Sequence, residues 1–317
     1  MKPVCNKVSV KVPATSANLG SGFDTAGIAL EYFDSLMFAL DESQDVSVII
    51  HGEGEDTLPK DETHLVVSTF RKACKIFGLP NLRFTLEARN QIPQARGMGS
   101  SASAIVAGVA AAWTFAHEGE LNREEIFEIA ASIEGHPDNV APAVFGGLTM
   151  SWKDSYSQEF HTVRYKVSKD ISVSVFVPNF ELSTELARRA LPANVPYGDA
   201  IFNVSRAAMI PVAFGALNGE SCDAVKSNLS RNELLFKQLR MRFISRIAQV
   251  LCRIRGIWWR RCARLVLRLR FRERVLALLY SMPGIVRSRT RKSTKLQSRG
   301  FRVTDGAFCT CRLTLRA

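Results

Sequence analysis

The chain has 317 residues, 46% of them hydrophobic, and carries 42 lysines and arginines against 30 aspartates and glutamates. This length predicts two domains, and the apolar content supports a packed core. No run of 18 apolar residues occurs and the first residues lack the apolar stretch of a secretory signal, so we expect a cytoplasmic protein with no membrane partner. The seven cysteines lack CxxC and histidine-paired spacings, which argues against a zinc site or a disulfide framework.

The charge is unevenly distributed along the chain. Residues 225–317 hold 20 arginines and four lysines against Glu233, Glu273 and Asp305, whereas the preceding residues are acidic overall. A basic segment of this kind is typical of nucleic-acid or anionic-membrane binding. The sequence therefore requires an explanation for a basic tail attached to an acidic body.

Hydrophobic periodicity predicts the elements in chain order. Apolar alternation predicts strands over residues 7–12, 46–50, 82–86 and 173–177. Helical spacing predicts helices over residues 64–77, 101–117, 123–133 and 184–191, the third capped by Asn122 with Glu125 three residues later. Residues 15–24, rich in Gly, Ser and Asn, are predicted to form a loop, and the polar run 152–157 a connection near a domain boundary at 155–168. Strands mixed with helices without strict alternation predict an α+β fold.

A glycine-rich stretch precedes the helix predicted over 101–117. Gly97 and Gly99 let the backbone approach an anion closely, and the helix beginning at Ser100 and Ser101 directs free N–H groups and a positive dipole end toward it. The Gly-Lys-Ser/Thr ending of the common P-loop is absent. The stretch therefore predicts a phosphate cradle, whose residues are Pro93, Gln94, Ala95, Arg96, Gly97, Met98, Gly99, Ser100, Ser101, Ala102 and Ser103.

Two further motifs accompany this loop. Residues 12–24 read Val-Pro-Ala-Thr-Ser-Ala-Asn-Leu-Gly-Ser-Gly-Phe-Asp, and residues 134–147 read Glu-Gly-His-Pro-Asp-Asn-Val-Ala-Pro-Ala-Val-Phe-Gly-Gly. With the loop and the run Ser183–Arg188, they resemble the motifs of the GHMP small-molecule kinases, in the versions found in homoserine kinases. The resemblance covers about residues 7–224.

The resemblance implies a two-domain fold and an ATP-dependent reaction. Residues 1–160 would form a ribosomal S5 domain 2-like ATP-binding domain, and residues 161–317 a ferredoxin-like domain that is disrupted after about residue 225. The implied reaction phosphorylates the side-chain hydroxyl of L-homoserine in threonine biosynthesis, with ATP and Mg²⁺ as cofactors. A homodimer is compatible with the resemblance.

The resemblance also implies which residues hold the metal. Mg²⁺ prefers hard oxygen ligands and keeps several waters. One ligand would be the hydroxyl of Ser100 or Ser101. The other would be the carboxylate of Glu128, eleven residues before Asn139, with Glu134 as the alternative.

The amino-acid substrate needs partners for its ammonium, carboxylate and hydroxyl groups. The resemblance implies Asp24 for the ammonium, with Asn18 and Asn139 bonding the polar ends. Arg188 would pair with the carboxylate, and Thr184, one helical turn earlier, would share its face.

Other members of the superfamily have a catalytic aspartate at the position of Asn139. An amide cannot accept a proton at neutral pH, so the resemblance implies catalysis without a protein base. A further substrate-binding arginine is expected in the C-terminal domain, with Arg240 and Arg242 as candidates.

The basic tail has an explanation in the genetic code. The glycine-rich loop Ser-Gly-Ala-Gly-Pro-Ser that related kinases carry here is absent, yet the codons from Phe271 to Ala277 permit it, in order, in a shifted frame. GC-rich Ala and Gly codons become Arg codons when shifted, which accounts for the charge. We therefore interpret the C-terminal part as frameshifted within residues 225–256.

Two alternatives to an active kinase follow. One is an inactive or unstable kinase remnant, and the other is a nucleic-acid-binding protein that uses the basic tail. The kinase interpretation expects L-homoserine and ATP as partners and no nucleic acid.

Overall fold

The computed structural model describes residues 1–168, 171–177, 192–215, 275–278 and 297–302. The chain divides into two compact units. The first holds residues 1–17 and 24–164, and the second holds residues 18–23 together with the described residues from 165 onward. None of the described helices has the length and apolarity needed to cross a membrane.

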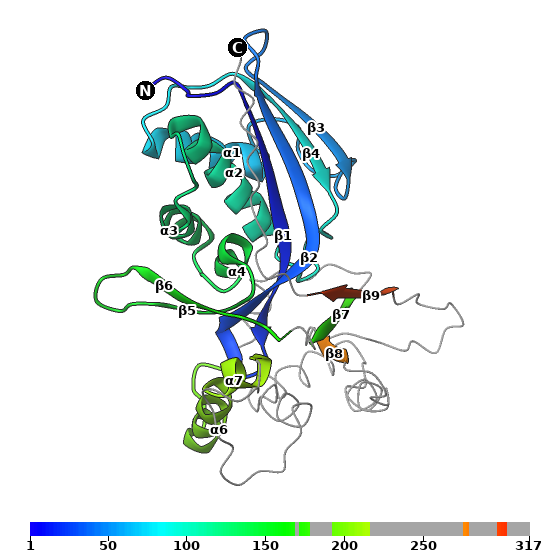
Figure 1. Ribbon diagram of the computed structural model, residues 1–317, viewed down its shortest axis with the longest axis vertical. Coiled ribbons are helices and arrows are strands. Elements are labelled where there is room, and N and C mark those ends of the chain that lie inside the picture. The colour runs from blue at the N-terminus through cyan, green and yellow to red at the C-terminus, as the bar shows by residue number, and fades with distance from the viewer. Residues whose placement is uncertain (169–170, 178–191, 216–274, 279–296, 303–317) are drawn as a thin grey trace. The chain divides into compact units, whose positions relative to one another are not determined.

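The first unit is built on a six-stranded sheet (Figure 1). Its strands are β1 (Lys7–Leu19), β2 (Gly22–Leu40), β3 (Val46–Gly52), β4 (Phe84–Asn90), β5 (Leu148–Lys153) and β6 (Phe160–Tyr165). The order is β3-β4-β2-β5-β6, with β1 also paired to β2. The long strand β2 pairs antiparallel with β4 through residues 35–40 and with β5 through residues 26–28, whereas β3 runs parallel to β4.

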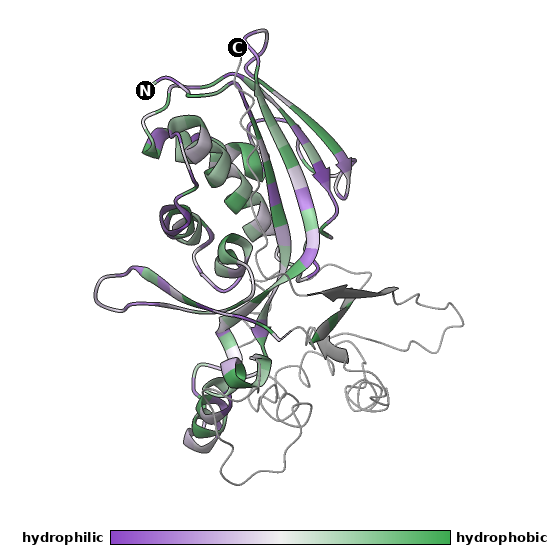
Figure 2. Ribbon diagram, in the orientation of Figure 1, coloured by the Kyte–Doolittle hydropathy of each residue, from purple (hydrophilic) through white to green (hydrophobic). Residues whose placement is uncertain are grey.

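Four helices cover one face of this sheet (Figure 1). They are α1 (Leu65–Ile76), α2 (Ser100–Ala116), α3 (Arg123–Glu134) and α4 (Val140–Phe145). Fourteen of the seventeen residues of α2 are buried. A helix that is apolar on all sides is an interior helix, and Figure 2 shows α2 within the layer of helices against the sheet.

The core between sheet and helices is centred on four fully buried phenylalanines. Phe38 of β2, Phe70 of α1, Phe84 of β4 and Phe115 of α2 each expose none of their surface. The ring centroids of Phe70 lie 4.8 Å from Phe84 and 5.0 Å from Phe38, in the tilted and edge-on arrangements that aromatic pairs favour. Through Phe70, which also lies 5.8 Å from Phe115, these rings pack helices α1 and α2 against strands β2 and β4.

The elements predicted by periodicity are confirmed in the first unit. The strands at 7–12, 46–50 and 82–86 lie within β1, β3 and β4 or overlap them, and the three helices match α1, α2 and α3 to within one residue at most ends. The side chain of Asn122 accepts a hydrogen bond from the N–H of Glu125 at 3.2 Å, so the predicted cap forms.

Two predictions about connections were wrong. Residues 15–24 are not one loop, because β1 continues to Leu19 and β2 starts at Gly22. Burial explains the difference: Thr15 and Ser16 expose at most 2% of their surface, so these polar residues continue a buried strand. The polar run 152–157 is the end of β5 and the turn before its sheet neighbour β6, rather than a link between domains.

The second unit contains β7 (Ser172–Val177), α6 (Tyr197–Ala207), α7 (Ile210–Phe214), β8 (Val275–Leu278) and β9 (Gln297–Arg302). β7, which confirms the strand predicted at 173–177, lies between β8, parallel to it, and β9, antiparallel to it. β8 and β9 lie within residues 225–317, the part of the second domain that we expected to be disrupted. The helix predicted over 184–191 lies outside the described residues.

The strands and helices together make the protein an α+β protein, as predicted. The boundary between the units falls after Arg164. The division into an ATP-binding domain over 1–160 and a ferredoxin-like domain over 161–317 stays a prediction.

Candidate active site

The glycine-rich loop between β4 and α2 alternates the sign of its backbone angle φ. Ala95, Gly97 and Gly99 have φ values of 51°, 75° and 70°, whereas Arg96 and Met98 between them do not have positive φ. Alternation between right-handed and left-handed backbone turns successive N–H groups toward one side and forms an anion-binding concavity. The alternating sign of φ is compatible with the predicted phosphate cradle.

The helix that follows leaves its first N–H groups available. Gly99 is the N-cap of α2, no side chain caps this end, and no acidic residue lies in the first turn. A helix N-terminus without a side-chain acceptor presents its unpaired N–H groups and its dipole to an external anion. The loop and the helix end therefore both favour bound phosphate.

Gly99 is packed against Thr15 of β1. A Cβ atom at this position would lie 1.9 Å from Oγ1 of Thr15 and 3.2 Å from Oδ1 of Asn139. The N–H of Thr15 also donates to the carbonyl of Met98 at 3.1 Å. Only glycine fits both the positive φ and this contact, so the loop is held at a fixed place beside Thr15 and Asn139.

The amide of Asn139 is bonded on both sides. Its Oδ1 accepts from Oγ1 of Thr15 at 2.8 Å, and its Nδ2 donates to Oδ1 of Asp138 at 3.4 Å. Asp138 exposes 1% of its surface, and the same Oδ1 lies 3.0 Å from Nδ1 of His136. These contacts fix which atom of the amide accepts and which donates.

The segment that carries Asn139 lies close to β2. A Cβ atom on Gly27 would lie 2.0 Å from the carbonyl oxygen of Asp138 and 2.9 Å from Cγ of Pro142. The absence of a side chain at Gly27 therefore allows the 138–142 segment to approach the sheet.

The two carboxylates predicted as metal ligands lie at different places. Oε2 of Glu134, at the end of α3, accepts from Oγ of Ser101 at 2.8 Å. Oε2 of Glu128 instead accepts from the backbone N–H of Phe160 in β6 at 3.3 Å. Glu134, the alternative, is thus the carboxylate that the structure brings to the loop.

The surroundings of Glu134 are electrostatically mixed. Burial raises the pKa of this carboxyl, and Asp138 adds to the rise, whereas the Ser101 hydroxyl and His136 oppose it. A carboxylate that is destabilised by burial and flanked by a hydroxyl gains from a nearby cation. Oxygen donors of this kind, one carboxylate and one hydroxyl beside a phosphate cradle, fit Mg²⁺.

The remaining predicted substrate residues are distributed over the chain. Asp24 lies in the first unit and Asn18 in the second, each with a positive φ, 54° and 59° respectively. Positive φ outside glycine is uncommon and is enriched in Asn and Asp. Thr184, Arg188, Arg240 and Arg242 lie outside the described residues, so their predicted roles stay predictions.

Sequence reasoning did not predict Thr15 or Asp138 as site residues. Both stand inside the two motifs, but neither has a residue type that indicates its role. The signal that would have found Thr15 is Gly99, where an added Cβ atom would lie 1.9 Å from the Thr15 hydroxyl oxygen.

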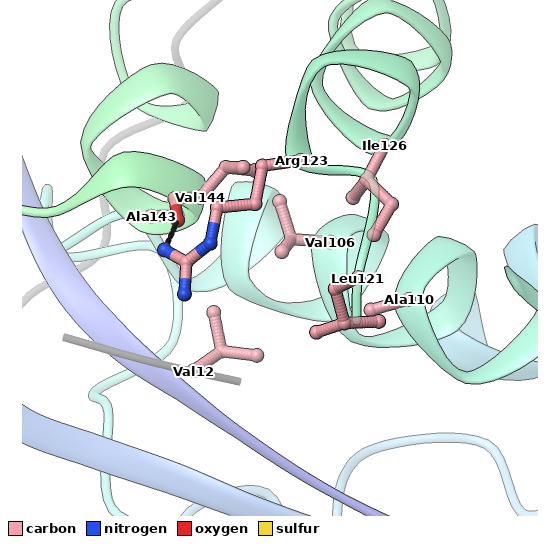
Figure 3. A pocket seen from close by; sticks show the side chains of 8 residues that line it. All are labelled: Val12, Val106, Ala110, Leu121, Arg123, Ile126, Ala143 and Val144. Atoms are coloured by element: carbon pink, nitrogen blue, oxygen red, sulfur yellow. Dashed lines mark hydrogen bonds between the residues drawn. The ribbon is translucent and has the colours of Figure 1, made fainter. Parts of the chain in front are cut away.

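An apolar pocket lies apart from this cluster (Figure 3). It is lined by residues of β1, α2, α3, α4 and the segment before α3, and Arg123 alone among the eight lining residues is charged. Nη1 of Arg123 donates to the carbonyl of Val144 at 3.0 Å. The pocket shares no residue with the phosphate loop, and we assign it no part in the candidate site.

Comparison with protein families supports the motifs. Residues 64–147 match the family described as GHMP kinases N terminal domain. This range includes the phosphate loop, Glu134 and Asn139.

Individual relatives extend the similarity. A homoserine kinase from Leifsonia xyli is 44% identical over 65% of this chain and 64% of its own length, and one from Cutibacterium acnes is 42% identical over 66% and 71%. The chain thus spans just under two thirds of the length of the Leifsonia relative.

Solved structures show the same fold. A structure titled as a putative homoserine kinase from Listeria monocytogenes is 34% identical, with a TM-score of 0.56 over 79% of this chain and 78% of its own. The homoserine kinase structure from Cytophaga hutchinsonii, at 22% identity, has a TM-score of 0.63 over 79% and 76%.

Proposed function

The chain belongs to the homoserine kinases of the GHMP kinase family, and from that premise we propose that it transfers the γ-phosphoryl group of ATP to the side-chain hydroxyl of L-homoserine. The product would be O-phospho-L-homoserine, on the route to threonine. The observation that carries the proposal is the convergence of three motifs at Gly99, where the phosphate loop contacts Thr15 and Asn139 and is followed by the Ser101–Glu134 hydrogen bond.

Phosphoryl transfer requires mainly positioning and charge stabilisation. The loop from Pro93 to Gly99 would hold the ATP phosphates through its backbone N–H groups, and the first turn of α2 would add its dipole. Gly99 fixes this loop against β1, so the phosphate position is set by the sheet rather than by a mobile segment.

We propose Glu134 and Ser101 as the residues that hold Mg²⁺, with Ser100 next to them. When bound, Mg²⁺ would neutralise charge that develops on the transferred phosphoryl group. The hydrogen bond of 2.8 Å between Oγ of Ser101 and Oε2 of Glu134 supports the proposal, because two oxygens this close can bind the same cation. The resemblance implied Glu128 as the carboxylate ligand. Because the Glu128 carboxylate accepts the backbone N–H of Phe160 instead, we propose Glu134 as the ligand.

Asn139 would orient the homoserine hydroxyl. Its amide is held by Thr15 and Asp138 and accepts no proton at neutral pH. The hydroxyl proton would therefore pass to the phosphate or to a water molecule. Asp24, Asn18 and Arg188 remain the proposed partners of the substrate's ammonium and carboxylate groups.

The test is direct. The 317-residue chain and a version with its downstream region moved into the alternative frame are each incubated with ATP, Mg²⁺ and L-homoserine, and phosphohomoserine and ADP are measured, with L-serine and L-threonine as comparison alcohols. Formation of phosphohomoserine with a clear preference for homoserine supports the proposal. Binding of Mg-ATP without transfer identifies an inactive remnant, and salt-sensitive retention of nucleic acid without nucleotide binding identifies the basic-tail alternative.

A further inference from the structure

A buried aspartate lies at the entrance to the phosphate loop. Asp34, on β2, exposes 5% of its surface. Its Oδ1 accepts the backbone N–H groups of Gln91 at 2.7 Å and Ile92 at 2.9 Å. These two residues connect β4 to Pro93, so one carboxylate oxygen holds the backbone immediately before the loop.

The same carboxyl group is close to the far end of the loop. Ser103, in the first turn of α2, exposes 1% of its surface and lies near enough for its hydroxyl to lower the pKa of Asp34. That hydroxyl has no partner of normal hydrogen-bond geometry in the part of the chain that the structure describes. Asp34 is thus placed at the start of the segment that would hold the phosphates.

Burial disfavours the ionised form of Asp34. The pKa of Asp34 is raised to about 6: burial is the main cause and Glu53 after β3 adds to it, whereas the N–H groups of Ile92 and Gln91 and the hydroxyl of Ser103 oppose the rise. The α2 helix brings no charged side chain to it. Ionised Asp34 therefore depends on the backbone N–H groups of the loop entrance for its stabilisation.

We propose that ionised Asp34 is a positioning residue that holds the loop 93–99 in the shape that binds the nucleotide phosphates. The identity of the bound phosphate rests on the proposed function. A charged acceptor makes hydrogen bonds about twice as strong as a neutral one. Protonation of Oδ2, or an amide in place of the carboxyl, leaves Oδ1 as an acceptor but removes this charge, so the loop entrance loosens.

The first test needs no ligand. Hydrogen exchange of a peptide spanning residues 91–99 is measured by mass spectrometry at pH 7.5 for the full chain, Asp34→Asn and Glu31→Gln. Glu31 is an exposed carboxylate on the same strand, three residues earlier. We expect exchange about 10-fold faster in Asp34→Asn and unchanged in Glu31→Gln. Equal protection of this peptide in all three proteins overturns the proposal.

The pH profile separates positioning from a general structural effect. After correction for intrinsic exchange, protection of residues 91–99 in the unsubstituted chain should fall between pH 7 and pH 5, whereas Asp34→Asn should show no such step. If Asp34→Asn does not fold, the step in the unsubstituted chain decides the question. Absence of the step overturns the proposal.

Nucleotide binding gives a third measurement. Titration with Mg²⁺ and a non-hydrolysable ATP analogue, without homoserine, should give a Kd about 10-fold higher for Asp34→Asn than for Glu31→Gln at pH 7.5. Unchanged or tighter binding by Asp34→Asn overturns the proposal. If neither the 317-residue chain nor its version in the alternative frame phosphorylates homoserine while these differences in loop exchange persist, the proposed function is rejected and the role of Asp34 stays supported.

Discussion

At the scale of single residues, the site depends on which carboxylate faces the loop. Counting along the chain favoured Glu128, because it stands eleven residues before Asn139. The fold brings Glu134 to Ser101 instead and places Glu128 against β6. The two acids lie six residues apart on one helix. At 3.6 residues per turn, their side chains therefore point in directions that differ by roughly 120°, toward different neighbours.

The two glutamates provide a matched pair of variants. Glu134→Gln should lower kcat on the order of 100-fold, because the amide loses the charge that would hold Mg²⁺. Glu128→Gln should retain activity within a few-fold, since an amide oxygen still accepts the N–H of Phe160. Steady-state kinetics at varied Mg²⁺ measures both. A large loss in Glu128→Gln with an active Glu134→Gln would return the metal role to Glu128.

Asn139 offers a second residue-scale prediction. Asn139→Asp should not increase turnover, because a carboxylate cannot donate to Asp138 and would repel the γ-phosphate. Asn122→Asp is the control: it adds the same charge at the N-cap of α3, where Asp caps as well as Asn. The initial rate of phosphohomoserine formation is the measurement. A clear gain in Asn139→Asp would show that the reaction lacks a base that a carboxylate can supply.

At the scale of elements, the loop, the strand β1 and the start of α4 form one structure around Gly99. Gly99→Ala should displace the Thr15 hydroxyl from Asn139 and abolish ATP-dependent turnover. Gly78→Ala is the control, because Gly78 has nearly the same φ, 68°, with no atom within 4 Å of an added Cβ. Both variants should lose about 1–3 kcal/mol of stability through backbone strain, as measured by urea unfolding, but Gly78→Ala should keep its activity. Equal activity in the two variants would show that turnover does not depend on the close contact of Gly99 with Thr15 and Asn139.

The contact of β2 with the loop entrance also predicts a pH dependence of stability. The pKa of Asp34 is about 6 in the folded chain against 3.8 as the ordinary value. A carboxyl group whose pKa is raised on folding stabilises the folded state at pH values below its ordinary pKa of 3.8. This stabilisation is lost as the pH rises through 6. Two units correspond to about 3 kcal/mol.

The measurement is the free energy of unfolding of the unsubstituted chain minus that of Asp34→Asn. This difference should fall by about 3 kcal/mol between pH 4 and pH 8. A difference that rises with pH would show that Asp34 is stabilised as the carboxylate. The loss of global stability above pH 6 reflects solvation of Asp34 in the unfolded chain, whereas loop protection reflects the two hydrogen bonds that its carboxylate accepts in the folded chain.

At the scale of the whole molecule, the similarity to homoserine kinases covers only part of the chain. The relatives from Leifsonia and Cutibacterium align with 65% and 66% of it, and the basic segment from residue 225 follows the region where we found the motifs. Short strands β8 and β9 lie beside β7 in the second unit, so the segment is not without strands. The α6 helix exposes Tyr197, Ile201 and Val204 along one side, at 83%, 53% and 69%.

The frameshift interpretation predicts a difference between two versions of the gene. The 317-residue chain should give a low soluble yield and little phosphohomoserine, because exposed apolar surface favours aggregation. A version with the downstream region moved into the alternative frame should raise both. Soluble yield and phosphohomoserine formation, measured side by side, decide the matter. A soluble and fully active 317-residue chain would refute the frameshift.

The sequence by itself predicted β1, β3, β4, α1, α2 and α3 of the first unit and the place of the glycine-rich loop, whereas β2, β5, β6 and α4 were not predicted. Alternation and helical spacing depend only on which residues are apolar. The ability of Gly97 and Gly99 to adopt positive φ is a property of glycine itself and needs no information about neighbours. It could not determine that residues 15–19 and 22–24 are strands, because burial by distant segments decides whether a polar run is a loop.

Only the tertiary structure decided which side chains meet. Thr15 meets Asn139 across 124 residues, Ser101 meets Glu134 across 33, and Asp34 meets Ile92 across 58. Such contacts depend on the packing of helices on a sheet, which fixes both distance and direction. Spacing along the chain therefore located the candidate site, and the packing of β1, β2, α2 and α3 decided its members.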